Sequence, residues 1–234
     1  ILEGDFHNDG DCVSLVGVTS VSSSIRNSGT IHGNGLIDTG FLQNGGLIST
    51  GGGDLAFSLS GTPDLDGVFQ DGQIEVNAGN LSLITQNPSV HNFNGSIEIG
   101  NGYTFSMMPS LGIELSDGST LDMLGATLRG PSVDIESSNN IVRIHAGAPS
   151  EIHTTEGLVL DGNVTLNGDL IVHGPALLGA GAEMDGDGTL VFEDDVDAED
   201  NTYVNVVTEI KGTFAPGDGV ARYVEFGDDL ISVS

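Results

Sequence analysis

A short pattern recurs along most of this chain and restricts its fold more than any other feature. A glycine or asparagine precedes an apolar–polar–apolar triplet, as in "DGQIEV" at Gly72 and "NGSIEI" at Gly95. Later copies of the pattern begin at Gly118, Asn140, Gly162, Gly188 and Gly212. A recurrent spacing of about 22 to 26 residues is typical of solenoids, in which each repeat is one turn of the chain.

Further triplets follow the first one within a repeat. Leu81–Leu83 lies about nine residues beyond Gly72, and Ile113–Leu115 lies just before the pattern at Gly118. Strict alternation over so few residues predicts short strands with one face inward and one outward. No segment combines capping residues with a helical period. We therefore predict an all-β chain, a single-stranded parallel β-helix with three short strands per coil of about 22–26 residues.

This fold sets the expected domain organisation and strand pairing. Residues 1–27 are predicted to lead irregularly into the structure or to form a first coil, and residues 28–234 to form the repeat domain. Each strand should pair with its equivalent one coil later; a sandwich of antiparallel hairpins would not predict the recurrence. The occurrence of asparagine at position 140 predicts a left-handed corner at each recurrent position, because asparagine tolerates a positive φ.

The charge of the chain excludes several classes of partner. Asp and Glu total 34 against 5 Lys and Arg, a formal charge of −29. Such a surface repels nucleic-acid phosphates and anionic lipid headgroups, so we expect no nucleic-acid partner. The sequence contains no run of 18 apolar residues, so we predict no membrane span. The same charge attracts cations, Ca²⁺ included.

Two stretches resemble a known class of proteins. Residues 29–61, "GTIHGNGLIDTGFLQNGGLISTGGGDLAFSLSG", are similar to the degenerate repeats of secreted bacterial parallel β-helix proteins, such as autotransporter passengers and PEP-CTERM-type surface proteins. Residues 212–234, "GTFAPGDGVARYVEFGDDLISVS", resemble the segment near the end of such arrays. The resemblance implies an extracellular or cell-surface location and a structural or adhesive role, with no family-wide catalytic residues; the PEP-CTERM sorting signal is missing here.

The predicted stacking suggests two places where calcium could bind. Glu75, Glu98 and Asp122 should form an outward column that ends at Arg143, and opposed like charges there would be relieved by Ca²⁺ or by salt. The second place is the acid-rich stretch around the longest predicted repeat, where extra length should form a loop. Its candidate ligands are Asp185, Asp187, Asp194, Asp195 and Asp197. The alternative for both places is an acidic surface that is simply solvated.

Other site motifs are missing from the sequence. The histidines at positions 7, 32, 91, 145, 153 and 173 show no zinc-type spacing, although His145 and His153 could meet across a corner. There is no G-x-S-x-G motif and no glycine-rich phosphate loop.

These observations favour an extracellular structural or adhesive β-solenoid segment of a bacterial surface protein, as a rigid spacer or a fibre subunit, stabilised by Ca²⁺ if the acid clusters bind it. Its expected partners are other copies, neighbouring repeats, or a component of the cell surface or matrix. The alternative is a β-helix polysaccharide lyase or hydrolase acting on acidic glycans, with Arg143 as the basic residue. Five cationic residues and no tryptophan argue against a cleft for acidic sugars. Calcium-mineral binding suits the acidity, whereas ice binding would require regular Thr-x-Thr rows.

Overall fold

All the regular elements that the structure describes are β-strands. The computed structural model describes residues 6–8, 12–61, 63–65, 72–135, 137, 139–199, 201–216, 224–227 and 230–232. No helix long and apolar enough to cross a membrane occurs among these residues. The strands are β1 (Phe6–Asn8), β2 (Cys12–Asn27), β3 (Thr30–Asn44), β4 (Leu47–Leu59), β5 (Gly72–Val76), β6 (Leu81–Thr85), β7 (Ser89–Phe93), β8 (Gly95–Ile99), β9 (Thr104–Ser106), β10 (Leu111–Leu115), β11 (Thr120–Met123), β12 (Thr127–Arg129), β13 (Ser132–Ile135), β14 (Ile141–Ile144), β15 (Ser150–His153), β16 (Gly157–Leu160), β17 (Asn163–Leu166), β18 (Leu170–His173), β19 (Ala176–Leu178), β20 (Glu183–Phe192), β21 (Val196–Ala198), β22 (Thr202–Ile210), β23 (Phe214–Pro216), β24 (Val224–Phe226) and β25 (Leu230–Ser232).

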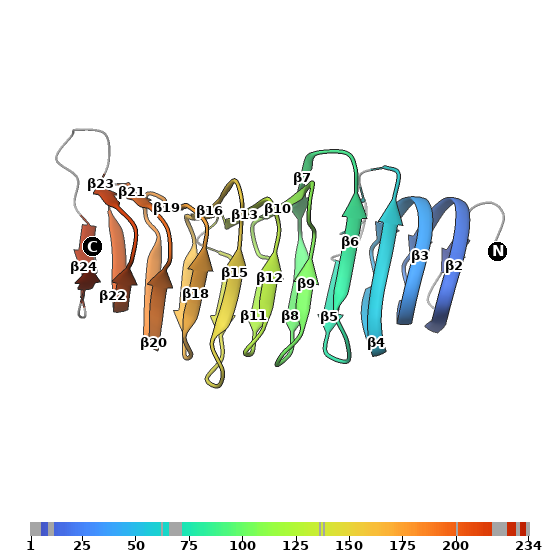
Figure 1. Cartoon of the computed structure of the whole chain (residues 1–234), viewed down its shortest axis with the longest axis horizontal. Helices are drawn as coiled ribbons and strands as arrows, with labels where there is room; N and C mark the ends of the chain where they lie inside the picture. The colour runs from blue at the N-terminus through green and yellow to red at the C-terminus, as the bar shows by residue number, and fades with distance from the viewer. Residues whose placement is uncertain are drawn as a thin grey trace.

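The strands wind into a parallel β-solenoid of about nine turns, as the sequence predicted. Every ladder is parallel and joins a strand to its equivalent in the next coil, for example β5 to β8, β6 to β9 and β7 to β10. The coils stack into a rod, with β2 near one end and β24 near the other (Figure 1). We call the faces by their order in a coil. The first face contains β5, β8, β11, β14 and β17; the second contains β6, β9, β12, β15 and β18; the third contains β7, β10, β13, β16 and β19.

Coil length varies along the rod. Paired positions are 18 apart for Cys12 and Thr30, 17 apart for Thr30 and Leu47, and 26 apart for Leu47 and Gln73. The short N-terminal coils have little room for loops, so β2 and β3 each run almost a full turn as one long strand. Cys12–Asn27, which precedes the predicted repeat domain, pairs with β3 along nearly its whole length. In the middle of the rod, three separate strands form each coil.

The core is a stack of apolar side chains inside the coils. On the first face, Ile74, Ile97, Leu121, Val142 and Val164 occupy paired positions in successive coils, and each is at most 3% exposed. Their polar neighbours point outward, which explains the alternation seen in the sequence. Burying one such side chain contributes about 1.5–3 kcal/mol, so the stack supplies most of the driving force for folding.

The recurrent glycines are corners, but the predicted left-handed backbone is wrong for most of them. Gly118 has a φ of 86°, whereas the other six positions, Asn140 included, lie outside the left-handed region. Close approach of the coils explains the small residues instead. A Cβ on Gly95 would lie 2.0 Å from the carbonyl oxygen of Gly72 one coil earlier, and a Cβ on Gly188 would lie 2.1 Å from that of Gly168. Only a residue without a Cβ allows the coils to stack at that distance.

Buried polar side chains bond the backbone at the corners between the third and first faces. The Asn140 amide donates to the carbonyl of Leu115 at 2.7 Å, and the Ser119 hydroxyl donates to that of Phe93 at 2.7 Å. Asn27 and Asn44 stack in the N-terminal coils, where the Asn27 amide donates to the Asn44 side-chain oxygen at 2.6 Å. These side chains add hydrogen bonds between successive coils; the Phe93 carbonyl also accepts from the backbone N–H of Ser116 at 2.8 Å.

The predicted alignment of the repeats is also wrong near the C-terminal end. The first-face strand of that coil begins at Glu183, because Asn163 pairs with Glu183. Gly188 stacks instead on Gly168 at the next corner, and Gly212 packs against Asp194 one corner later still. All three corners favour small residues before an alternating strand, so the local pattern does not tell one face from another. Since Glu183 in turn pairs with Tyr203, this coil is shorter than predicted and holds no extra loop.

Candidate functional site

The predicted acidic column lies on the first face. Glu75 pairs with Glu98, Glu98 with Asp122, and Asp122 with Arg143, so the predicted order of the column is confirmed. On the third face, Glu114 pairs with Asp134, so two acids are also directly opposed there. Calcium binding by Glu75, Glu98 and Asp122 remains a prediction.

Arg143 and His145 both contact the carboxylate at the C-terminal end of this column. The Arg143 guanidinium lies 3.3 Å from Asp122 Oδ2, and His145 Nε2 lies 3.1 Å from Asp122 Oδ1. Asp122 therefore has partners on both carboxylate oxygens. His145 is directed at this first-face carboxylate, whereas His153 lies on the second face with its Nε2 directed at Glu151, so the predicted meeting of the two histidines does not occur.

The acid-rich stretch is spread over the rod rather than gathered in a loop. Asp185 lies on the first face and accepts a hydrogen bond from the Asn205 amide at 2.9 Å, whereas Asp197 lies on the third face in β21. Asp194 accepts from the backbone N–H of Gly174 at 2.8 Å, and Asp195 from that of Thr213 at 2.7 Å.

Two of these carboxylates therefore bond the backbone of a neighbouring coil. Asp187 is exposed in β20. Within the described ranges, no three of the predicted ligands converge on one point. Calcium binding by this stretch also remains a prediction.

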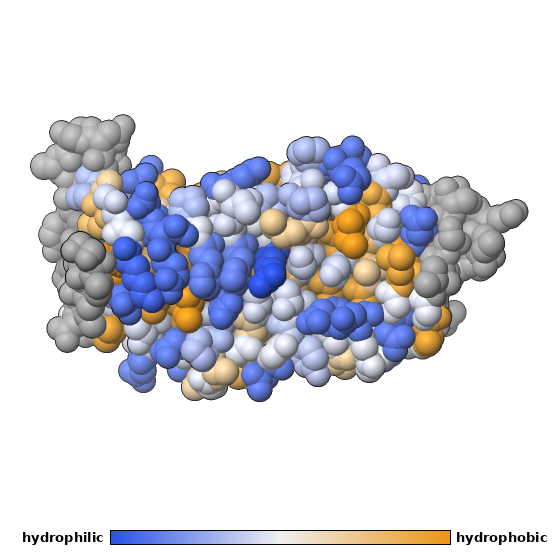
Figure 2. Space-filling view, viewed as in Figure 1, coloured by the Kyte–Doolittle hydropathy of each residue, from blue (hydrophilic) through white to orange (hydrophobic). Residues whose placement is uncertain are grey.

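Among the residues that the structure describes, the one group of three potential metal ligands that converge lies on the second face. Arg129, His153 and His173 occupy paired outward positions in three successive coils. Glu193 and Lys211 continue the same column, since their backbone N–H groups bond the neighbouring coils in the same register. Figure 2 shows the face that carries β12, β15 and β18 in Figure 1, with hydrophilic side chains gathered over its C-terminal half and apolar patches among the N-terminal coils.

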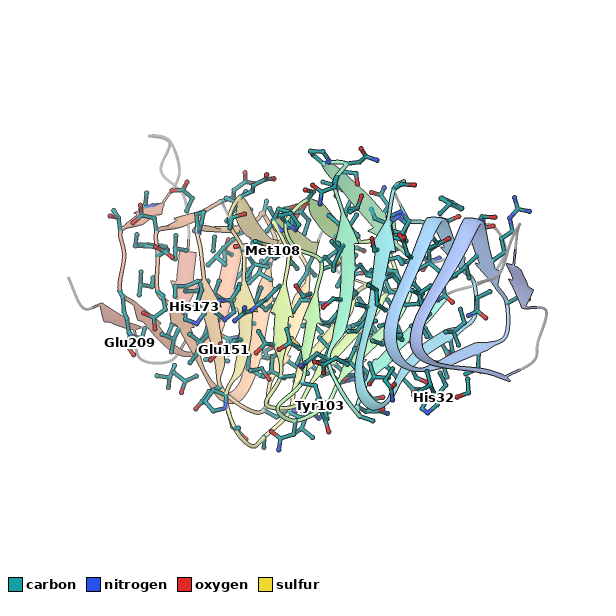
Figure 3. All side chains as sticks on the ribbon, turned by 45° about the vertical axis from the view of Figure 1, so that its right-hand side comes forward. His32, Tyr103, Met108, Glu151, His173 and Glu209 are labelled. Atoms are coloured by element: carbon teal, nitrogen blue, oxygen red, sulfur yellow. The ribbon has the colours of Figure 1, made fainter. Side chains whose placement is uncertain are left out.

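Glu151, two residues before His153 in β15, forms a compact cluster with His153 and His173. His153 Nε2 lies 2.7 Å from Glu151 Oε2, and His173 Nε2 lies 3.9 Å from the same oxygen. The two imidazole rings are stacked, with centroids 4.1 Å apart and planes 18° apart. Figure 3 shows Glu151 and His173 side by side on the outer surface of the sheet.

The cluster borders a shallow, open pocket. The pocket holds about 360 Å³ and is lined by Met108, Arg129, His153, Thr154, Thr155, His173, Gly174 and Asp194. Farther along the column, the Lys211 ammonium lies 2.8 Å from Glu193 Oε1. This contact lowers the pKa of Glu193 and raises that of Lys211, chiefly through the hydrogen bond. Lys211 is therefore held by a carboxylate next to the histidine pair.

Comparison with family models, with curated proteins and with solved structures finds no match to this chain. The fold and the side-chain geometry are therefore the basis for inferring its function.

The sequence contained a signal for the histidine cluster that the spacing rules did not detect. Glu151 and His153 are separated by one residue, and His173 follows His153 by the local length of one coil. Zinc motifs are defined by short spacings in the sequence, so they cannot detect a ligand that lies one coil away. Only an alignment that matches Ser150 with Leu170 brings the three residues together.

Proposed function

We propose that this chain is a rigid structural or adhesive segment of an extracellular or cell-surface protein, and that it has no catalytic role. The observation that carries the proposal is the unbroken parallel ladder that links β2 to β22 through every coil. A rod with continuous backbone pairing and a filled apolar core suits a spacer or a display surface.

The charge and the resemblance to secreted bacterial repeat proteins support the proposed location. Columns of exposed acids keep such a rod soluble and prevent adhesion between like-charged flanks. They leave the ends of the rod and any cation-bridged face as the contact surfaces. Other copies, neighbouring repeats, or a matrix component reached through Ca²⁺ are therefore the proposed partners.

Surface labelling of intact cells that produce the protein tests the location. Antibodies raised against the purified chain should label unpermeabilised cells or their surrounding matrix, and an antibody to a cytosolic protein serves as the control. Labelling that appears only after permeabilisation would contradict the proposal.

An activity assay separates the rod from the glycan-cleaving enzyme. Arg143 would be the basic residue of such an enzyme. In the structure it contacts Asp122, so its guanidinium is less available to bind an acidic substrate. We expect no unsaturated product and no new reducing ends when the chain is incubated with pectate or alginate and Ca²⁺. Cleavage that is lost in R143A would favour the enzyme instead.

A further inference from the structure

We propose that Glu151, His153 and His173 bind a divalent transition metal of the Zn²⁺ class on the flank of the solenoid. Each residue offers one ligand atom, and the three atoms lie within 4.8 Å of one another. In the part of the chain that the structure describes, this is the one group of three potential ligands that meets this condition. The inference does not depend on the proposed structural role.

The fold itself brings the three ligands together. Glu151 and His153 are two positions apart in β15, so their side chains leave the same face of the sheet. His173 is the register partner of His153 in β18 and lies directly beside it. The intervening residues Ile152 and Val172 are 1% and 0% exposed, so the core fixes both strands under the site.

The chemistry of the donor set selects the metal. Two imidazole nitrogens and one carboxylate oxygen match the ligands of Zn²⁺ and its neighbours in the transition series. Ca²⁺ takes six to eight oxygen ligands, which this cluster does not supply. The site thus differs in kind from the acidic clusters predicted from the sequence.

Binding requires a local rearrangement of side chains only. Zn–N and Zn–O bonds of about 2.0–2.2 Å place ligand atoms closer together than the 3.9 Å between His173 Nε2 and Glu151 Oε2. The stacked rings must also turn, so that their Nε2 lone pairs converge on the ion. The side chains of Glu151, His153 and His173 are 38%, 30% and 35% exposed, so this motion disturbs no buried group. The contact between His153 Nε2 and Glu151 Oε2 must open as the metal takes both ligand atoms.

The surroundings leave room for an additional ligand. The open pocket beside the histidines contains Thr154, Thr155 and the carboxylate of Asp194, so water can complete the coordination. Arg129, next to His153 in the column, opposes a cation, and Lys211 is engaged by Glu193. The chain as a whole carries −29 and raises the local concentration of cations.

A bound metal would join two coils of the rod. Glu151 and His153 belong to one coil and His173 to the next, so the ion acts as a clamp across the β15–β18 ladder. Because the metal binds the folded chain, it should raise the melting temperature with increasing concentration.

Calorimetric titration of the tag-free chain with Zn²⁺ tests the site. We expect one ion per chain, with tetrahedral-type absorption bands when Co²⁺ replaces Zn²⁺. H173Q and E151Q should each weaken binding by at least about tenfold, because loss of even an outer-shell partner of a metal ligand typically costs about 10–100-fold. The control H32Q removes an exposed histidine whose Nδ1 faces Ser49, far from the cluster in Figure 3, and should bind as the wild type does.

The outcomes separate this site from general attraction to an acidic surface. Zn²⁺ binding should persist in excess Ca²⁺, and the far-UV circular dichroism of both variants should match the wild type. Absence of saturable Zn²⁺ binding to the wild type would overturn the proposal. Equal affinity of wild type and E151Q or H173Q, or displacement of Zn²⁺ by equimolar Ca²⁺, would overturn it as well.

Discussion

Substitution of Gly95 by alanine tests whether close stacking of the coils is the reason for the recurrent glycines. The new Cβ would lie 2.0 Å from the Gly72 oxygen, whereas real Cβ atoms essentially never come closer than 3.0 Å. To restore a 3.0 Å contact, strands β5 and β8 must move apart locally by about 1 Å. The normal spacing between paired strands is about 4.8 Å. Such a shift breaks about two ladder hydrogen bonds and overpacks the corner. At about 1 kcal/mol per bond and about 1–3 kcal/mol for overpacking, G95A should lose about 3–5 kcal/mol of unfolding free energy.

Gly100, five positions farther along, provides a matched control. It also lies outside the left-handed region, but a Cβ there would meet its nearest atoms at 3.5 Å, an ordinary contact. G100A should be neutral or more stable by about 0.4–1 kcal/mol, because alanine restricts the unfolded chain.

Urea unfolding followed by far-UV circular dichroism measures both variants. With a slope of about 2 kcal/mol per molar urea, the midpoint for G95A should fall by about 1.5–2.5 M. A loss below about 0.5 kcal/mol for G95A would refute the explanation, since a separation of about 1 Å cannot cost so little. An equal loss for G100A would refute it too, because no clash exists there.

Three further predictions follow from other parts of the rod. N44A removes an amide that donates to the Leu65 carbonyl at 3.3 Å and accepts from a stacked asparagine, so urea unfolding should show a loss of about 3 kcal/mol. Burial lowers the pKa of His91, whose Nε2 accepts from the backbone N–H of Leu65. Below about pH 6.5 the unfolded chain therefore gains a proton that the folded chain resists, so stability should fall towards about pH 5, and less in H91Q. Added NaCl should raise the melting temperature by screening Glu75 from Glu98, an effect that E98Q should reduce.

The fold was predictable because the pattern that encodes it is local. An outward polar residue between two inward apolar ones, as in Ile97–Ile99, indicates a strand and shows which side chains point into the core. Repetition of this pattern indicates the solenoid. The positions of the acidic column followed from the same alternation, since stacked coils place Glu75, Glu98 and Asp122 in line.

The backbone conformation at the corners was not predictable in the same way. A corner can require glycine either because its φ is positive or because there is no space for a Cβ. The sequence does not distinguish these two reasons. Gly118 is the first kind, and Gly95 is the second. The discriminating quantity is the distance to a carbonyl one coil earlier, which is a property of the stack and not of the glycine's neighbours in sequence.

The histidine cluster depends on the exact register between β15 and β18. An error of one residue in aligning β15 with β18 would place His173 beside Ile152 or Thr154, and the side chains would then leave opposite faces. The sequence alignment based on first-face corners contained no equivalent of β15 and so could not fix this register. In a solenoid, a site built from neighbouring coils depends on the register between the paired strands. His153 and His173 are such a register pair. A single residue inserted into the loop between β16 and β17 can bulge out of that loop, so β15 and β18 keep their register. Zn²⁺ affinity should therefore survive such an insertion, whereas an insertion within β18 before His173 should abolish it.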